Sequence, residues 1–294
     1  MIKTAIKKLV DLKRLVTLHV PPGHFYSPIP NIEELKVKEK EIFDTKDREL
    51  AGIDLNEVEQ LEILAAFKKY YDEQPFPQKK TEGMKYYFEN SYYSYADGMS
   101  LYSMMRYLKP KRIIEVGSGY SSSVTLDTNQ LFFDNKIELT FIEPYPERLL
   151  SLVQKGDEQI NFKLFKQEVQ NVELKLFKEL EQNDILLIDS SHVSKTNSDV
   201  NYLLFKVMPV LQSGVIIHFH DIHYPFEYPK HWIYQGWAWN EAYILRAFLQ
   251  YNKDFKIVFF YSFLKEFYEA QFKEMPLYLK NPGGNIWLRK IVDD

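Results

Sequence analysis

The chain contains no cysteine at all. Disulfides, thiolate metal sites and cysteine nucleophiles are therefore excluded together, and we expect a cytoplasmic protein. No stretch approaches the roughly 20 consecutive apolar residues that cross a bilayer, so an integral membrane protein is not expected. The net charge is −4, and no basic stripe is interleaved with aromatic residues, so we expect no nucleic-acid partner.

Apolar and aromatic residues, in contrast, are abundant, at 45% and 16% of the 294 residues, and predict a well-packed core. Residues 1–96 are expected to form a mainly helical N-terminal extension, and residues 97–294 the main domain. Ile2–Val16 places apolar residues on one helical face with lysines opposite. We expect this helix to pack on its own chain or on a second subunit of a homo-oligomer; binding flat on a membrane surface is the alternative.

Apolar strand candidates alternate with helical segments from Arg112 onward, which favours an α/β fold with a mostly parallel sheet and helices on both faces. The segment between the last two strands has no strong helical period, so these strands are expected to pair antiparallel. The strand candidates are residues 112–116, 138–142, 160–165, 184–188, 214–219, 255–261 and 285–290. The helix candidates among them are residues 121–132, 146–154, 196–208 and 237–251.

A nucleoside-binding pattern lies at residues 111–147. The first strand ends at Glu115 and passes into a turn built on Gly117 and Gly119, and the second strand closes on Glu143. Glycines let the backbone approach a ligand, and a carboxylate after the second strand can accept hydrogen bonds from ribose hydroxyls. The spacing of strand, glycine turn, helix, strand and acid therefore indicates a nucleoside ligand.

From Asp97 to its C-terminus the chain resembles the class I S-adenosylmethionine-dependent methyltransferases, on the glycine turn, Glu143 and the seven strand candidates. The resemblance implies a Rossmann-like seven-stranded sheet whose last two strands form a reversed hairpin. It also implies that Glu115 faces the ammonium of the cofactor and that Glu143 holds the ribose. Ser121 stands where the family has a third glycine. The implied cofactor-binding residues are Glu115, Gly117, Gly119, Ser121, Glu143 and Gln167.

Acids and histidines gather where two neighbouring strands end: Asp189 and His192 after the fourth, His220 and Asp221 after the fifth. The carboxyl ends of parallel strands converge on the crevice where ligands bind. Asp189, Asp221 and His192 are the expected catalytic residues, with His192 accepting a proton as a neutral imidazole. The spacing is similar to that of metal-dependent sugar O-methyltransferases, and implies a Mg²⁺ site at Asp189, Asp221 and His220. His220 replaces the first of two adjacent acids, which leaves the metal open.

The sequence therefore predicts an enzyme that transfers a methyl group from S-adenosylmethionine to a hydroxyl of a small acceptor, with a sugar or glycan unit as the best guess. Two alternatives stay open. His218 and His220 with Asp221 or His192 could form the iron site of an oxygenase. The fold could also serve as a non-catalytic interaction module. The tryptophan-rich loop at residues 222–239 is expected to be either a substrate wall or a dimer contact.

Overall fold

The computed structural model describes residues 18–44, 47–153 and 162–291. Contacts divide the chain into two units, Met1–Lys46 with Tyr228–Trp239, and Asp47–Glu227 with Asn240–Asp294. The expected boundary between residues 96 and 97 stays a prediction, and the contacts place residues 47–96 in the larger unit. The amphipathic segment Ile2–Val16 lies outside the described residues.

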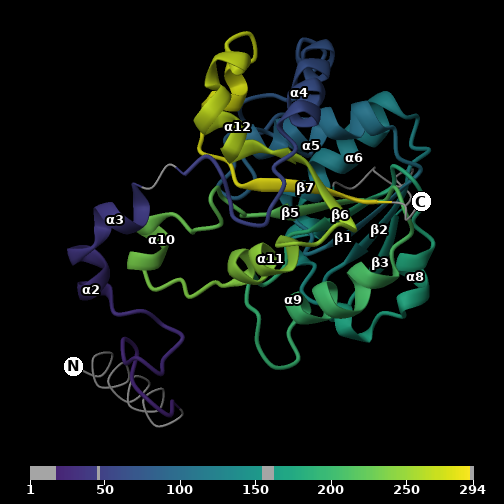
Figure 1. The fold of residues 1–294 in the computed structure, drawn as a ribbon. Coiled ribbons are helices and arrows are strands. Elements are labelled where there is room, and N and C mark those ends of the chain that lie inside the picture. The colour runs from purple at the N-terminus through teal and green to yellow at the C-terminus, as the bar shows by residue number, and fades with distance from the viewer. Residues whose placement is uncertain (1–17, 45–46, 154–161, 292–294) are drawn as a thin grey trace, which may run out of the picture. The chain divides into compact units, whose positions relative to one another are not determined.

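The larger unit is built on a seven-stranded sheet with the order β3-β2-β1-β4-β5-β7-β6 (Figure 1). Strands β1 to β5 are parallel, whereas β7 runs antiparallel to both β5 and β6. The predicted sheet with its reversed hairpin is therefore confirmed. The strands are β1 (Arg112–Val116), β2 (Glu138–Ile142), β3 (Phe162–Phe165), β4 (Ile185–Ile188), β5 (Ile216–His220), β6 (Phe255–Phe260) and β7 (Asn285–Lys290).

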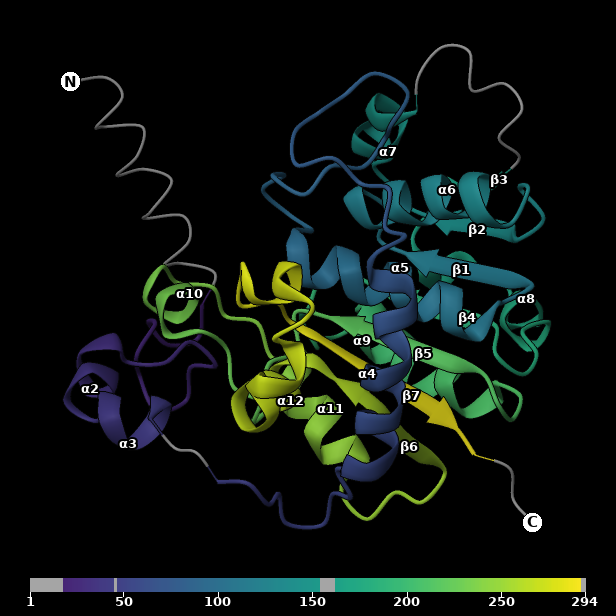
Figure 2. The same ribbon diagram turned by 90° about the horizontal axis from the view of Figure 1, so that it is seen from above.

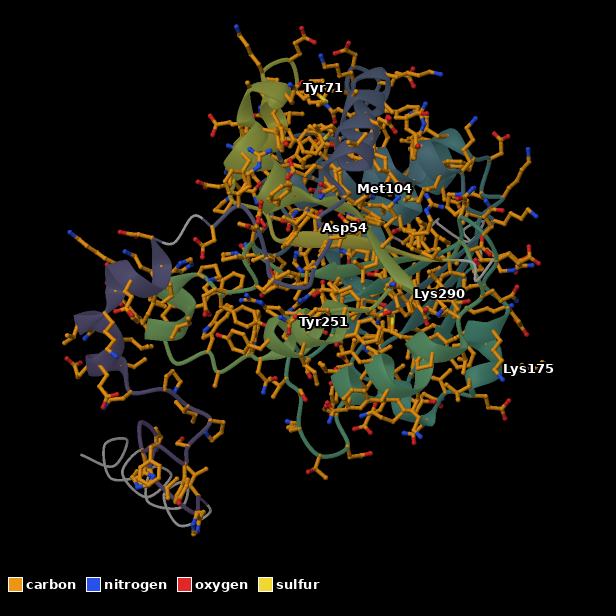
Figure 3. All side chains as sticks on the ribbon, viewed as in Figure 1. Asp54, Tyr71, Met104, Lys175, Tyr251 and Lys290 are labelled. Atoms are coloured by element: carbon orange, nitrogen blue, oxygen red, sulfur yellow. The ribbon has the colours of Figure 1, made fainter. Side chains whose placement is uncertain are left out.

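Helices cover both faces of this sheet, which explains why the central strands are almost continuously apolar. On one face lie α4 (Glu57–Tyr71), α5 (Tyr95–Leu108) and α6 (Tyr120–Phe132) (Figures 1 and 2). On the other lie α8 (Leu174–Lys178), α9 (Asp199–Tyr202) and α11 (Glu241–Leu249) (Figure 1). Met104 of α5 is fully buried, while Lys175 of α8 points to solvent (Figure 3).

Shorter elements complete the larger unit. They are α7 (Glu147–Leu152), α12 (Tyr261–Tyr268), a π-helix (Leu203–Val207) and four 3₁₀ helices (Val169–Asn171, Met208–Val210, Glu269–Phe272 and Pro276–Leu279). Helix α12 was not expected, because its eight residues are too short to show a clear period. No helix in the described part of the chain has the length and apolar character needed to span a membrane.

Helix α4 begins at Glu57, three residues after Asp54. The Asp54 carboxylate accepts a hydrogen bond from the Asn56 backbone N–H at 2.8 Å, and Asn56 has φ 51°. The chain therefore turns once before the helix starts. Asn56 then ties this turn to the sheet, since its side-chain amide donates to the Ile257 carbonyl of β6 at 2.8 Å.

The smaller unit contains α2 (Ile32–Val37), α3 (Glu39–Phe43) and α10 (Lys230–Tyr234). Glu39 accepts hydrogen bonds from Lys230 at 2.9 Å and from the Tyr234 hydroxyl at 2.8 Å. Three tryptophans of the tryptophan-rich loop contact one another, with ring centroids 4.7–5.4 Å apart: Trp232, Trp237 and Trp239. Their roles as substrate wall or dimer contact stay predictions.

Candidate active site

A cavity of about 510 Å³ opens at the carboxyl ends of β1, β2 and β4, where ligands bind in open α/β sheets. Its wall is formed by the residues at the ends of β1 and β2, the turn after β3 and the loop after β4. The lining residues are Val116, Gly117, Ile142, Glu143, Pro144, Tyr145, Glu168, Val169, Gln170, Asp189, Ser190, Ser191, Lys195, Asn197, Ser198 and Asp199.

Gly117 is the position in this loop that requires a glycine. Its φ is 88°, and a Cβ added there would lie 1.7 Å from the Asp189 carbonyl oxygen. A side chain would therefore push apart the loops that follow β1 and β4. Gly119 is less constrained, because its φ of −172° is extended and its added Cβ would lie 3.3 Å from Cδ of Arg148. Of the two predicted glycines, Gly117 lines the cavity and Gly119 is the N-cap residue directly before α6.

Glu115 is fully buried directly before this turn. Its Oε1 accepts a hydrogen bond from the Ser121 hydroxyl at 2.5 Å, whereas no group in the described residues donates to its Oε2. Burial raises the pKa of Glu115 to about 8. The serine in place of a third glycine thus supports the acid and leaves one carboxylate oxygen free for a donor.

Glu143 lies on the cavity wall at the end of β2. Backbone N–H groups hold its carboxylate on both sides, from Ser118 to Oε2 at 3.1 Å and from Tyr145 to Oε1 at 2.7 Å. Gln167 does not line the cavity; its amide donates to the Asn171 carbonyl at 3.0 Å. The neighbouring Gln170 lines the cavity instead.

The predicted strand-end residues do come together, and His192 lies at their centre. Its Nδ1 lies 2.8 Å from Oε2 of Glu241, and its Nε2 lies 3.5 Å from Asp189 and 3.7 Å from Asp221. The N–H groups of Asn240 and Glu241, at the start of α11, both donate to the His192 carbonyl at 3.1 Å. Helix α11 therefore holds this histidine by side chain and backbone.

His220 occupies the matching position on the other side of the two aspartates. Its Nδ1 lies 3.2 Å from Asp189 and 3.6 Å from Asp221, and its Nε2 lies 3.9 Å from Asp97. The Tyr93 ring packs 4.8 Å away. The result is a row from Glu241 to Asp97 in which each imidazole lies between acids. We call it the acid–imidazole cluster: Glu241, His192, Asp189, Asp221, His220 and Asp97.

The electrostatics of the acid–imidazole cluster contradict one expectation. Burial would lower the pKa of His192, but its bonds to Asp189 and Glu241 raise it to about 10. This raised pKa argues against the neutral imidazole expected at pH 7. Burial disfavours the charged form of His220 as well, yet Asp221 and Asp189 hold its pKa well above the usual value.

The two inner aspartates differ from each other. Burial opposes ionisation of Asp189, but the charge of His220 and the bonds to both histidines hold its pKa far below the usual value. Burial dominates at Asp221 and raises its pKa to about 6. Asp221 and His192 also have positive φ values, 56° and 58°, which non-glycine residues adopt rarely and which concentrate at functional sites.

The predicted metal set finds no support in this geometry. Within the residues that the structure describes, no group of three or more acidic or histidine side chains is arranged to hold a metal ion. Asp189, Asp221 and His220 pair with one another as acids and imidazole, so the set does not fit Mg²⁺, which binds through oxygen atoms. The metal stays a prediction.

The proposed iron site also fails to form around His218. This side chain is fully buried, its ring centroid lies 4.3 Å from that of Trp287, and its Nε2 lies 3.4 Å from the Tyr93 hydroxyl. Burial lowers the pKa of His218 to about 3. It is a packed, neutral histidine of the core.

Sequence reasoning missed three members of the site. Asp97 lies in the first turn of α5 and Glu241 is the first residue of α11, while Tyr93 comes from the tyrosine-rich segment before α5. The strand-end rule considers residues after strands alone, so it does not find them. No signal in the sequence links Glu241 to His192, which lies 49 residues earlier.

Comparison with known proteins identifies the family of the chain. Residues 114–222 match the family model described as a methyltransferase domain. An uncharacterized protein of Archaeoglobus fulgidus is 40% identical over 171 residues, which span 56% of this chain and 75% of that protein. The chain belongs to the class I S-adenosylmethionine-dependent methyltransferases, and it is an enzyme of that class.

Solved structures are similar at a lower level. The S-adenosylhomocysteine-bound methyltransferase PaMTH1 of Podospora anserina is 16% identical with a TM-score of 0.43, covering 79% of this chain and 88% of its own. The O-methyltransferase TomG of Streptomyces achromogenes is 12% identical with a TM-score of 0.40, covering 88% and 96%. At this distance the substrate has to be argued from the chain's own residues.

Proposed function

We propose that the protein transfers the methyl group of S-adenosylmethionine to a hydroxyl oxygen of a small acceptor, such as a sugar. The position of Asp189 carries the proposal. This residue lines the cavity and also pairs with His192 and His220. The nucleoside cavity and the acid–imidazole cluster are therefore continuous, as methyl transfer from a bound cofactor to a neighbouring hydroxyl requires.

The cavity residues fit the cofactor. Glu143 presents a fixed carboxylate for the ribose hydroxyls, and Gly117 allows the closest approach of backbone to ligand. Glu115 does not line the cavity itself, and we assign its buried Oε2, which has no donor in the described residues, to the ammonium of the methionine part. When bound, the cofactor supplies an activated methyl group on a sulfonium.

The chain itself must remove the hydroxyl proton of the acceptor. We assign this step to Asp221, because a carboxylate with a pKa of about 6 is ionised at pH 7 yet still basic enough to accept a proton. His192, whose Nε2 lies 3.7 Å from Oδ2 of Asp221, orients this carboxylate with its own proton in place. Asp189 balances the charge of both histidines, so the site remains ordered while the proton moves.

Calorimetry with S-adenosylhomocysteine tests the cofactor, and incorporation of radiolabelled methyl into a panel of sugars, phenols and amines tests the acceptor. We expect measurable binding and methyl ethers as products. His192→Ala should lose methyl transfer and keep cofactor binding, since His192 does not line the cavity. Absence of cofactor binding, or methylation confined to amines, would refute the proposal.

A further inference from the structure

Arg148 carries a positive charge that no acid neutralises. It lies in α7, and its guanidinium carbon lies 4.0 Å from the centre of the Tyr92 ring. Its Cδ passes beside Gly119 of the glycine turn. Among the residues that the structure describes, no carboxylate pairs with this guanidinium and no oxygen accepts a hydrogen bond from it. Its N–H donors are therefore available to a ligand.

The tyrosine-rich segment before α5 holds this guanidinium in place. The Tyr92 ring stacks on that of Tyr120, the first residue of α6, with centroids 5.9 Å apart and planes at 15°. Oδ1 of Asn90 accepts hydrogen bonds from the backbone N–H groups of Tyr92 at 3.0 Å and Tyr93 at 2.7 Å, which fixes the segment. A guanidinium stacked on an aromatic ring is partly ordered already, so it loses less freedom when it binds a ligand.

A hydroxyl proton without an acceptor lies in the same group of side chains. The hydroxyls of Tyr87 and Tyr120 are 3.0 Å apart. One donates to the other, and the proton of the accepting hydroxyl has no acceptor in the described part of the chain. Burial and the Tyr87 hydroxyl raise the pKa of Tyr120 to about 12, against the charge of Arg148. The hydroxyl therefore keeps its proton at neutral pH and serves as a donor.

The acids near Arg148 in the sequence do not compete for these donors. Both carboxylate oxygens of Glu143 accept backbone N–H groups, at 3.1 and 2.7 Å. Glu147 directly precedes Arg148 in α7, and successive residues of a helix do not face each other. Arg148, Tyr92 and Tyr120 are also absent from the cavity wall. Tyr145, on that wall, lies one helical turn before Arg148 in the sequence, so these donors adjoin the cofactor cavity without forming part of it.

We propose that Arg148 and the Tyr87–Tyr120 hydroxyl pair form a subsite for a phosphate group of the methyl acceptor. The edge of a guanidinium binds two oxygens of a phosphate through parallel N–H bonds, and the hydroxyl proton supplies a donor for a further oxygen. The link to the acceptor rests on the proposed function, whereas phosphate binding by Arg148 does not. A sugar phosphate is then a better acceptor than the same sugar without its phosphate.

Calorimetry with glucose 6-phosphate and with glucose tests the subsite, on protein saturated with S-adenosylhomocysteine so that the cofactor cavity is filled. The wild type should bind glucose 6-phosphate at least about tenfold more tightly than glucose. Arg148→Met should remove this preference, and Arg148→Lys should keep part of it, because lysine retains the charge without the planar fork. Lys175→Met is the matched control: it removes one exposed positive charge from α8, on the opposite face of the sheet (Figure 3), and should keep the wild-type preference.

A second pair of variants tests the stacking. Tyr92→Phe keeps the ring beside the guanidinium and should keep the preference, whereas Tyr92→Leu should weaken binding of glucose 6-phosphate several-fold, by roughly the worth of one exposed cation–π contact. Equal binding of the two probes by the wild type, or an unchanged preference in Arg148→Met, overturns the subsite.

The cofactor measurement separates this subsite from the proposed function. Arg148→Met should bind S-adenosylhomocysteine as the wild type does; loss of that affinity instead would assign Arg148 to the cofactor and overturn the subsite. If the wild type fails to bind S-adenosylhomocysteine, the proposed function falls. Titration of inorganic phosphate into the ligand-free protein then decides the subsite alone, since Arg148→Met must weaken phosphate binding for it to stand.

Discussion

Glu115→Gln should make the ligand-free protein more stable at neutral pH, although it replaces a residue of the cofactor site. Glutamine has the same shape, and its amide oxygen can still accept the hydrogen bond from the Ser121 hydroxyl. What it removes is an acid that is hard to ionise, because burial raises the pKa of Glu115 from 4.5 to about 8.

The size of the effect follows from the linkage between protonation and folding. Between pH 4.5 and about 8 the folded chain keeps a proton on Glu115 that the unfolded chain releases, so stability falls as the pH rises. At pH 7, about 2.5 pH units above 4.5, the cost is about 3 kcal/mol at 1.36 kcal/mol per unit. The variant should therefore unfold about 6–12 °C higher at pH 7, at about 2–4 °C per kcal/mol for a protein of this size.

Thermal unfolding of wild type and Glu115→Gln at pH 4.5, 6, 7 and 8 measures this difference. The gap in melting temperature should be small at pH 4.5 and widen toward pH 8. Asp184→Asn is the control: Asp184 is equally buried but accepts bonds from the backbone N–H groups of Lys111 and Arg112, so this variant should be less stable. A gap that does not depend on pH would refute the reasoning. Glu115→Gln should also bind S-adenosylhomocysteine more weakly, because glutamine cannot release a proton to become the charged partner of the ammonium.

Three further outcomes test other parts of the site. Gly117→Ala should lower the melting temperature and weaken S-adenosylhomocysteine binding at least tenfold, because the added methyl group meets the Asp189 carbonyl; calorimetry with near-normal affinity would contradict this. Glu143→Gln should weaken the same binding about tenfold and lower the melting temperature slightly, since its NH₂ end can accept a bond neither from a ribose hydroxyl nor from the backbone N–H that faces it. Asp221→Asn should abolish methyl transfer. The rate of the wild-type enzyme should rise with pH and level off above about pH 6. A rise that continues toward pH 10 would identify His192 as the base.

Local patterns in the sequence predicted most of the fold. The bounds of β1, β2 and β7 agree with the apolar runs because charged residues and turns flank each of them in the sequence. The cofactor-binding residues could be predicted equally well, since Gly117 and Glu143 follow their strands directly. The role of Ser121 could not be predicted from the sequence. It becomes clear from the structure, in which the Ser121 hydroxyl donates a hydrogen bond to Glu115.

The charge state of the acid–imidazole cluster could not be predicted, and the reason is physical. An isolated strand-end histidine titrates near neutral pH, so His192 reads as a base. Its proton is held by Glu241 of α11, while the proton of His220 is held partly by Asp97 of α5, and the sequence gives neither partner. Two imidazoles between four acids can be buried together because each charge offsets its neighbours, whereas either histidine alone would be neutral at such depth. Asp221, whose pKa this balance leaves near neutral, is therefore the base that we propose.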